Sequence, residues 1–173
     1  MGSLNELKTT PMSIEDLRKF LPKNAKAVLY KTLSSSKKDV FSDHDCVVVL
    51  YETKINNKKQ GHYISLIDRG GYVEYFSSLG KGSTVELSEL ELKETNKFKQ
   101  ILGNNYRYSK IMLQNQANYT INDCGLFCIA RILLKNKKLR DFVKILKTKP
   151  KNTDDSISLM SLLLVNFVHQ KSA

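Results

Sequence analysis

The chain has 173 residues, of which 41% are hydrophobic, and this is enough for one domain with a proper core. Apolar runs such as residues 162–165 are far too short to span a bilayer, and no basic region followed by an apolar one marks a secretory signal, so we expect neither a membrane protein nor a secreted one. The formal net charge of +11 favours polyanionic partners such as nucleic acid, although no motif that reads DNA or RNA accompanies it.

Cysteine usage indicates a reducing compartment. The chain has three cysteines, so they cannot all pair with one another. Cys124 and Cys128 fall on one predicted helix, which is a poor geometry for a disulfide, and Cys46 falls in a predicted strand. The cysteines and the three histidines show no spacing of four zinc ligands, so we expect neither a bound metal nor a required cofactor.

The N-terminal half of the chain predicts a short helix followed by strands. Ser13 is a helix cap with an acidic residue three positions later, and Pro22 ends that helix. Residues 23–38 are polar and are predicted to be irregular. Strands rich in β-branched and aromatic residues are predicted at residues 46–51, 61–68 and 72–76. A turn at residues 56–59 joins the first two strands, and a tight glycine turn at residues 70–71 joins the last two.

The C-terminal half predicts mainly helices. Residues 87–102 have a helical apolar pattern that ends at Gly103, a favourable C-cap, and residues 106–113 predict another strand. Three more helices are expected: one from Cys124 to a break at residues 136–138, one over residues 139–147, and one after a linker at residues 150–152 with its apolar stripe at residues 157–167. This order predicts an α+β fold, in which a central, mostly antiparallel sheet packs against the Cys124 helix and further helices flank it. We expect a single domain over residues 1–173.

The helix that begins at Cys124 is the first candidate for chemistry. Asn122 or Asp123 can cap it, so Cys124 falls in its first turn. Unpaired backbone N–H groups and the helix dipole lower the pKa of a thiol there, and the thiolate is the reactive form. Gly125 lets another backbone or a substrate approach closely. An isolated cysteine at a helix start is more often a small apolar residue, so its partners decide between the two interpretations.

A thiol nucleophile needs a base, and the chain has three histidines. His62 begins an apolar strand directly after Gly61. His44 lies in a polar loop before a strand, and His169 lies near the C-terminus after a predicted helix. His62 is the best placed of the three, although such a histidine taken alone is more often structural.

Four short motifs in sequence order resemble the adenain-like cysteine proteases. They are Gly-His-aromatic on the strand at residues 61–67, Tyr-Phe-Ser-Ser-Leu-Gly at residues 75–80, a glutamine at 114 or 116, and Asp-Cys-Gly opening the helix at residues 123–128. The family includes the maturation proteases of adenoviruses and related enzymes of large DNA viruses, virophages and polinton-type elements. More distantly, it includes the proteases that remove ubiquitin-like modifiers. The motifs cover less than half of the chain.

The resemblance implies a cysteine endopeptidase in which Cys124 is the nucleophile and His62 is the general base and acid. The Cys124 backbone N–H and a glutamine amide would hold the oxyanion. Gln116 is the last glutamine before the cysteine, whereas Gln114 directly follows a predicted strand, so both remain candidates. The other two cysteines would be core residues.

The third member of the site departs from the family. Asp, Glu or Asn usually precedes Ser-Leu-Gly, and this chain has Ser77 there. If the glycine turn sets the register, paired residue numbers sum to about 140, and His62 faces Ser77 or the two residues after it. Asp68 is then about 20 Å from His62 along the strand and Glu74 about 13 Å, so neither reaches the imidazole. We expect the Ser77 hydroxyl to orient His62, directly or through water, and leave open a carboxylate elsewhere in the chain.

Substrates and partners follow from the resemblance alone. It implies processing of viral capsid or scaffold precursors during virion maturation, in the virion and in the host cytoplasm or nucleus. The basic run at residues 135–151 is usually a solvated helix face, but DNA assists related proteases, so double-stranded DNA is an expected partner and DNA or a peptide an expected activator. Two alternatives stay open: removal of ubiquitin-like modifiers, and a catalytically inactive relative that binds DNA or capsid protein.

Overall fold

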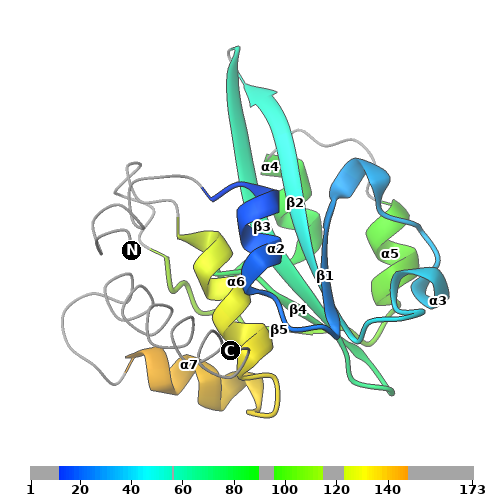
Figure 1. Ribbon diagram of the computed structural model, residues 1–173, viewed down its shortest axis with the longest axis vertical. Helices are drawn as coiled ribbons and strands as arrows, with labels where there is room; N and C mark the ends of the chain where they lie inside the picture. The colour runs from blue at the N-terminus through cyan, green and yellow to red at the C-terminus, as the bar shows by residue number, and fades with distance from the viewer. Residues whose placement is uncertain (1–11, 56, 90–95, 115–122, 148–173) are drawn as a thin grey trace.

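A five-stranded sheet with helices on both faces forms the centre of the protein (Figure 1). The structure is a computed structural model that describes residues 12–55, 57–89, 96–114 and 123–147. The strands, which lie across the sheet in chain order, are β1 (Ala25–Leu29), β2 (Cys46–Ile55), β3 (Lys58–Asp68), β4 (Val73–Phe76) and β5 (Arg107–Tyr108). Strands β2, β3 and β4 pair antiparallel, and β1 and β5 add to the two edges in parallel. This confirms the predicted α+β class and its mostly antiparallel sheet.

The helices form two layers, one on each face of the sheet. The described helices are α2 (Ile14–Phe20), the 3-10 helix η1 (Tyr30–Thr32), α3 (Lys37–Val40), α4 (Ser83–Glu89), α5 (Asn96–Leu102), α6 (Cys124–Leu133) and α7 (Leu139–Lys147). Helices α2, α6 and α7 lie on one face, and α3, α4 and α5 lie on the other (Figure 1). Because side chains alternate along a strand, Ile67 packs under α6 while its neighbour Leu66 packs in the opposite core. Burial on both faces explains why β2 reads as an almost unbroken apolar run.

Several local predictions are confirmed by the coordinates. The Ser13 hydroxyl caps α2 by accepting the Asp16 N–H at 3.1 Å. Gly103 ends α5 with φ 63°, a left-handed conformation that suits glycine. Ile67 pairs with Glu74 across the β3–β4 hairpin, which is the predicted register. Helix α7 covers residues 139–147, as the apolar pattern indicates.

Three predicted elements are wrong in extent. Residues 23–38 are not irregular, since they contain β1, η1 and the start of α3. The single helix expected at residues 87–102 begins earlier, at Ser83, and a separate helix covers the end of that range, with residues 90–95 outside the described part. The strand expected at residues 106–113 is only two residues long. Short edge strands carry too few side chains for a clear period, and β1 is a five-residue edge strand.

A buried ion-pair cluster fixes the C-terminal end of α6 to the sheet. Arg131 is fully buried and donates to both carboxylate oxygens of Glu74 on β4, at 2.7 and 3.1 Å. Arg69 donates to the same carboxylate at 2.9 Å. Arg131 also donates to the carbonyls of Leu134 and Lys137, which are acceptors left open at the helix end. The cluster therefore anchors the helix that carries Cys124.

Two sets of predictions lie outside the described residues. Gln116 is one, and the linker at residues 150–152 with its following helix is the other. Within the described part of the chain, no helix has the length and apolarity needed to cross a membrane.

Candidate active site

Cys124 occupies the first residue of α6, as the sequence predicts, with Asp123 at the N-cap. Its side chain is 7% exposed. Backbone N–H groups of Tyr63 and of the first turn of α6 favour the charged form of the Cys124 thiol. The Tyr63 N–H belongs to the peptide bond that follows His62. Cys124 and Tyr63 belong to one core cluster, so the start of α6 lies against β3 at the residue that follows the candidate base.

Gly125 explains how α6 comes so close to β3 and α2. A Cβ at this position would lie 3.3 Å from Leu17 Cδ1 and 3.4 Å from Tyr63 Cδ2, which is tighter than usual van der Waals contact. The Tyr63 hydroxyl in turn donates to the Met12 carbonyl at 2.9 Å. A larger residue would push the first turn of α6, and with it Cys124, away from the sheet.

Burial controls the acidity of the Cys124 thiol. It raises the pKa of Cys124 to about 11, and the N–H groups of Tyr63, Gly125 and Cys124 itself oppose this only in part. The prediction of a lowered thiol pKa is therefore wrong for the free protein, because the cost of removing a thiolate from water outweighs the helix start. At neutral pH the resting site holds a thiol and needs a base.

His62 lies on β3 and is 6% exposed. Its Nε2 is 3.0 Å from the Ser77 Oγ, so the structure brings these two predicted residues together. Burial lowers the pKa of His62 to about 4, and the positive charge of Lys81 adds to this effect. The imidazole is consequently neutral at physiological pH, which is the form that can accept a proton.

Glu86 is the residue that sequence reasoning missed. It is 2% exposed and lies on α4, and its carboxylate accepts a hydrogen bond from the Ser77 hydroxyl. The Glu86 Oε1 is 3.7 Å from His62 Nε2, too far for a direct hydrogen bond but within ion-pair range. Burial raises the pKa of Glu86 to about 7, against hydrogen bonds from Ser77 and Tyr75.

One sequence signal could have found the helix that carries Glu86. Ser83 and Glu86 match the Ser-x-x-Glu pattern of a helix start, which would have placed the beginning of α4 correctly. The two carboxylates that were considered do lie elsewhere, as expected: Asp68 pairs with Lys37 at 3.1 Å, and Glu74 belongs to the Arg131 cluster.

Of the two candidate glutamines, the structure describes only Gln114. Its backbone N–H donates to the Ser78 carbonyl at 3.0 Å, and its amide oxygen accepts from the Ser78 hydroxyl at 2.8 Å. Gln114 is therefore fixed to the loop that carries Ser77. The NH2 group of a glutamine amide is the donor that an oxyanion hole requires.

The backbone of this loop depends on Gly80. Its φ is +68°, and a Cβ there would lie 2.5 Å from the Ile111 carbonyl carbon and 2.6 Å from the Met112 nitrogen. Only glycine allows the two chain segments to cross at this distance. The crossing sets the position of Ser77 relative to Gln114.

The remaining cysteines have structural positions. Cys46 and Cys128 are fully buried, and all three cysteines are free thiols. Burial raises the pKa of Cys46 to about 12 and that of Cys128 well above its ordinary value. Both residues are therefore core residues, as predicted.

Comparisons with known proteins find distant likenesses. No protein-family model matches the chain. Uncharacterized protein V9 of the Sputnik virophage is 27% identical over 161 residues, which cover 83% of this chain and 87% of that protein. The C-terminal Ulp1 protease domain in complex with Smt3, the yeast ortholog of SUMO, is 17% identical, with 92% of this chain and 80% of that chain covered and a TM-score of 0.40. The SUMO protease Ulp1 with its catalytic cysteine oxidised to a sulfinic acid is 15% identical, with 88% and 76% covered and a TM-score of 0.33.

Proposed function

We propose that the protein is a cysteine endopeptidase of the adenain-like type. One observation carries this proposal: Cys124 packs in one core cluster with Tyr63, the residue that follows His62 on β3, and the Nε2 of the neutral His62 imidazole is 3.0 Å from the Ser77 Oγ. A thiol at a helix start and a neutral, oriented imidazole on the adjoining strand are the two groups that nucleophilic catalysis requires.

The reaction begins from a neutral pair. His62 Nδ1 takes the proton of Cys124 as the sulfur attacks the peptide carbonyl carbon, and the carbonyl electrons move to the oxygen. The Cys124 backbone N–H and a glutamine amide, Gln114 or Gln116, hold this oxyanion. The imidazolium then gives its proton to the leaving nitrogen, the C–N bond breaks and a thioester remains. A water that His62 deprotonates hydrolyses the thioester and restores the thiol.

Viral capsid or scaffold precursors are the proposed substrates, and the infected cell and the virion are the proposed compartments. The likeness to a virophage protein over most of both chains supports a viral context. The test is to incubate co-encoded capsid proteins with wild type, with Cys124→Ala, and with Cys46→Ala as a matched control that also removes a buried thiol. We expect cleavage by wild type and Cys46→Ala only. Equal cleavage by Cys124→Ala would refute the proposal.

A protease for ubiquitin-like modifiers is the alternative with the same chemistry. This alternative predicts cleavage directly after the diglycine of a modifier that carries a C-terminal extension. Incubation with extended modifiers and, separately, with capsid protein therefore distinguishes the two substrate classes. Release of the extension with no cleavage of capsid protein would favour the alternative.

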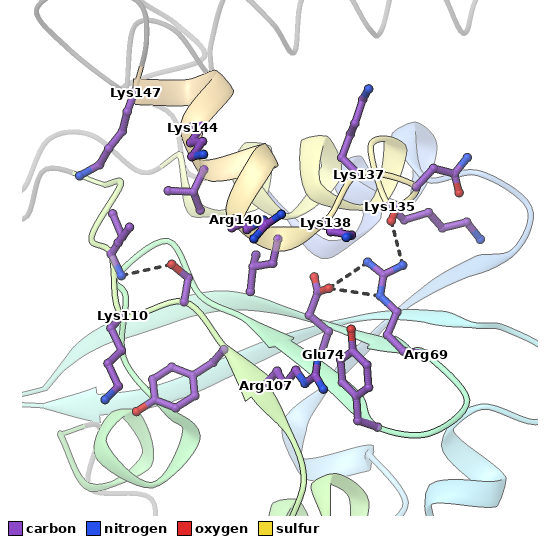
Figure 2. A pocket seen from close by; sticks show the side chains of 17 residues that line it. Arg69, Glu74, Arg107, Lys110, Lys135, Lys137, Lys138, Arg140, Lys144 and Lys147 are labelled. Carbon is purple, nitrogen blue, oxygen red and sulfur yellow. Dashed lines mark hydrogen bonds and ion pairs between the residues drawn. The ribbon is translucent and has the colours of Figure 1, made fainter.

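Double-stranded DNA is the proposed partner of a basic cleft at the C-terminal end of α6. This cleft has a volume of about 980 Å³ and lies between α7, β5 and the β3–β4 turn (Figure 2). Its basic lining residues are Arg69, Arg107, Lys110, Lys135, Lys137, Lys138, Arg140, Lys144 and Lys147. The acidic lining residue, Glu74, is already paired with arginines. Such a concentration of positive charge attracts phosphates and releases their counterions on binding.

Salt dependence tests the DNA proposal. The double variant Lys138→Gln/Lys144→Gln should bind duplex DNA more weakly and reduce the slope of log affinity against log salt by about one for each lysine–phosphate pair that it removes. The variant Lys31→Gln/Lys99→Gln makes the same charge change at exposed sites on η1 and α5 and should have little effect. Equal effects of the two variants would mean that only net charge matters. Tight DNA binding without any proteolysis would favour the inactive relative.

A further inference from the structure

A buried chain of hydrogen bonds joins His62 to side chains on the α4 face of the sheet. His62 Nε2 meets the Ser77 hydroxyl at 3.0 Å, and Ser77 meets the Oε1 of Glu86. The other oxygen of Glu86 accepts the Tyr75 hydroxyl, which lies 2.9 Å from the Tyr51 hydroxyl. All five side chains are buried, and α4 supplies the only carboxylate that the described residues place in this chain. A buried carboxylate without a cationic partner in contact is costly, which points to a role beyond packing.

Proton accounting at Ser77 fixes the tautomer of His62. A hydroxyl has one proton to donate and two lone pairs that accept. An ionised Glu86 can only accept hydrogen bonds, so the Ser77 hydroxyl donates its hydrogen bond to Glu86. One lone pair of Ser77 accepts the Leu79 backbone N–H at 3.2 Å. The other lone pair must then accept a hydrogen bond from the N–H at His62 Nε2, so the unprotonated ring nitrogen is Nδ1.

We propose that Glu86, acting through the Ser77 hydroxyl, is the positioning residue that keeps His62 in its Nε2–H tautomer and stabilises the imidazolium. The role in catalysis rests on the proposed peptidase function. In that role the Cys124 proton moves to Nδ1, while His62 Nε2 and Ser77 keep their own protons and Glu86 stays ionised. The serine at the position of the family's acid is therefore a bridge to a carboxylate on another element.

The charged groups around Glu86 decide when it is ionised. Ser77 and Tyr75 donate to it, Lys81 favours its charged form, and the negative charge of Glu89 on the same helix opposes it. His62 faces it across Ser77. Burial raises the pKa of Glu86 to about 7, so Glu86 is fully ionised, and holds His62 in the Nε2–H tautomer, only above neutral pH.

The first experiment does not depend on catalysis. Nitrogen-15 NMR of the imidazoles at about pH 8 reports the tautomer of each of the three histidines, and the His62→Gln spectrum assigns His62. We expect the Nε2–H tautomer in wild type. In Glu86→Gln the amide can donate to Ser77, which turns the Ser77 proton toward Nε2, so the Nδ1–H tautomer should become populated. An Nδ1–H tautomer in wild type, or no change in Glu86→Gln, would overturn the proposal.

The second experiment measures the pH dependence of kcat/KM. Wild type should gain activity as pH rises through about 7, where Glu86 ionises. Glu86→Gln should lose this rise and about 100-fold in kcat/KM at pH 8, mostly in kcat. Glu89→Gln, an exposed carboxylate on the same helix, is the matched control and should keep the rise but move it to lower pH, because it removes a negative charge that opposes ionisation of Glu86. A rise that survives in Glu86→Gln would contradict the role.

Two further outcomes are informative. If Glu86→Gln does not fold, Ser77→Ala removes the bridge while leaving Glu86 in place, and it should also lose the single tautomer. Ser77→Ala combined with Glu86→Gln should be no worse than the poorer single variant, because both break one connection. If the tautomer behaves as expected but wild type cleaves nothing, the proposed function fails and the assignment of Glu86 stands.

Discussion

Gly80→Ala should be among the most damaging single-methyl additions in the protein. Its left-handed φ of +68° costs an alanine about 1–2 kcal/mol. A Cβ would also lie 2.5 Å from the Ile111 carbonyl carbon, and overpacking of this kind costs about 1–3 kcal/mol. The two effects add to a loss of about 2–5 kcal/mol in the free energy of unfolding. Because Gly80 holds the Ser77 loop against the Gln114 segment, kcat/KM should fall as well.

Two other glycines separate the causes. Gly70 has φ +78°, and a Cβ added there would meet no atom within 4 Å, so Gly70→Ala measures the backbone effect alone, about 1–2 kcal/mol. Gly71 has open space and no left-handed φ, so Gly71→Ala should change stability by less than about 0.5 kcal/mol. Urea unfolding of the three variants gives the comparison. If Gly80→Ala costs no more than Gly70→Ala, the close crossing at Ile111 does not exist.

Three more predictions concern stability. Glu74→Gln should lower the free energy of unfolding by about 3–5 kcal/mol, because it leaves buried Arg131 without its counter-charge. Asp16→Asn at an exposed pair should change stability little, and equal urea midpoints of the two variants would refute this. As pH falls from about 6.5, His62 in the unfolded chain takes up a proton, whereas the folded residue stays neutral because its pKa is near 4. The free energy of unfolding therefore falls with pH. Folded Glu86, with its pKa near 7, keeps a proton below pH 7 that the unfolded residue releases, so Glu86 opposes the loss of stability caused by His62. Glu86→Gln should therefore make stability fall more steeply between about pH 6.5 and 4.5. An unchanged pH dependence of the free energy of unfolding, measured with urea, would contradict the burial of both groups. Tyr63→Phe removes the bond to Met12 and should cost about 1 kcal/mol, again by urea unfolding, and a neutral result would mean that this hydrogen bond adds nothing.

The sequence predicts the centre of this fold better than its edges. Strands β2 and β3 and helix α7 have long, strongly patterned runs, and the glycine turn sets the register that brings His62 near the segment that carries Ser77. Strands β1 and β5 have five and two residues, and their pairing depends on neighbours rather than on their own side chains. The start of α4 was misplaced because its apolar pattern begins only at Leu87.

The candidate site was predictable where local chemistry decides, and not where tertiary contact does. A cysteine at a helix start and a histidine beside a glycine are visible in the chain, and the structure places them on neighbouring elements. The role of Glu86 was invisible because nothing near it in the sequence shows that α4 turns its carboxylate toward Ser77. The raised pKa of Cys124 was missed for a related reason, since burial is a property of the whole fold and here exceeds the effect of the helix start.

Covalent capture of Cys124 by a peptidyl vinyl sulfone tests the central claim most directly. The sulfur must add to the vinyl carbon while a neighbouring acid protonates the adjacent carbon, so the reaction needs the thiol and the imidazole together. At neutral pH, mass spectrometry should find the adduct on Cys124 alone in wild type, formed about 100-fold more slowly in His62→Gln. Equal rates in the two proteins, or adducts spread over Cys46 and Cys128, would contradict the pairing of Cys124 with His62.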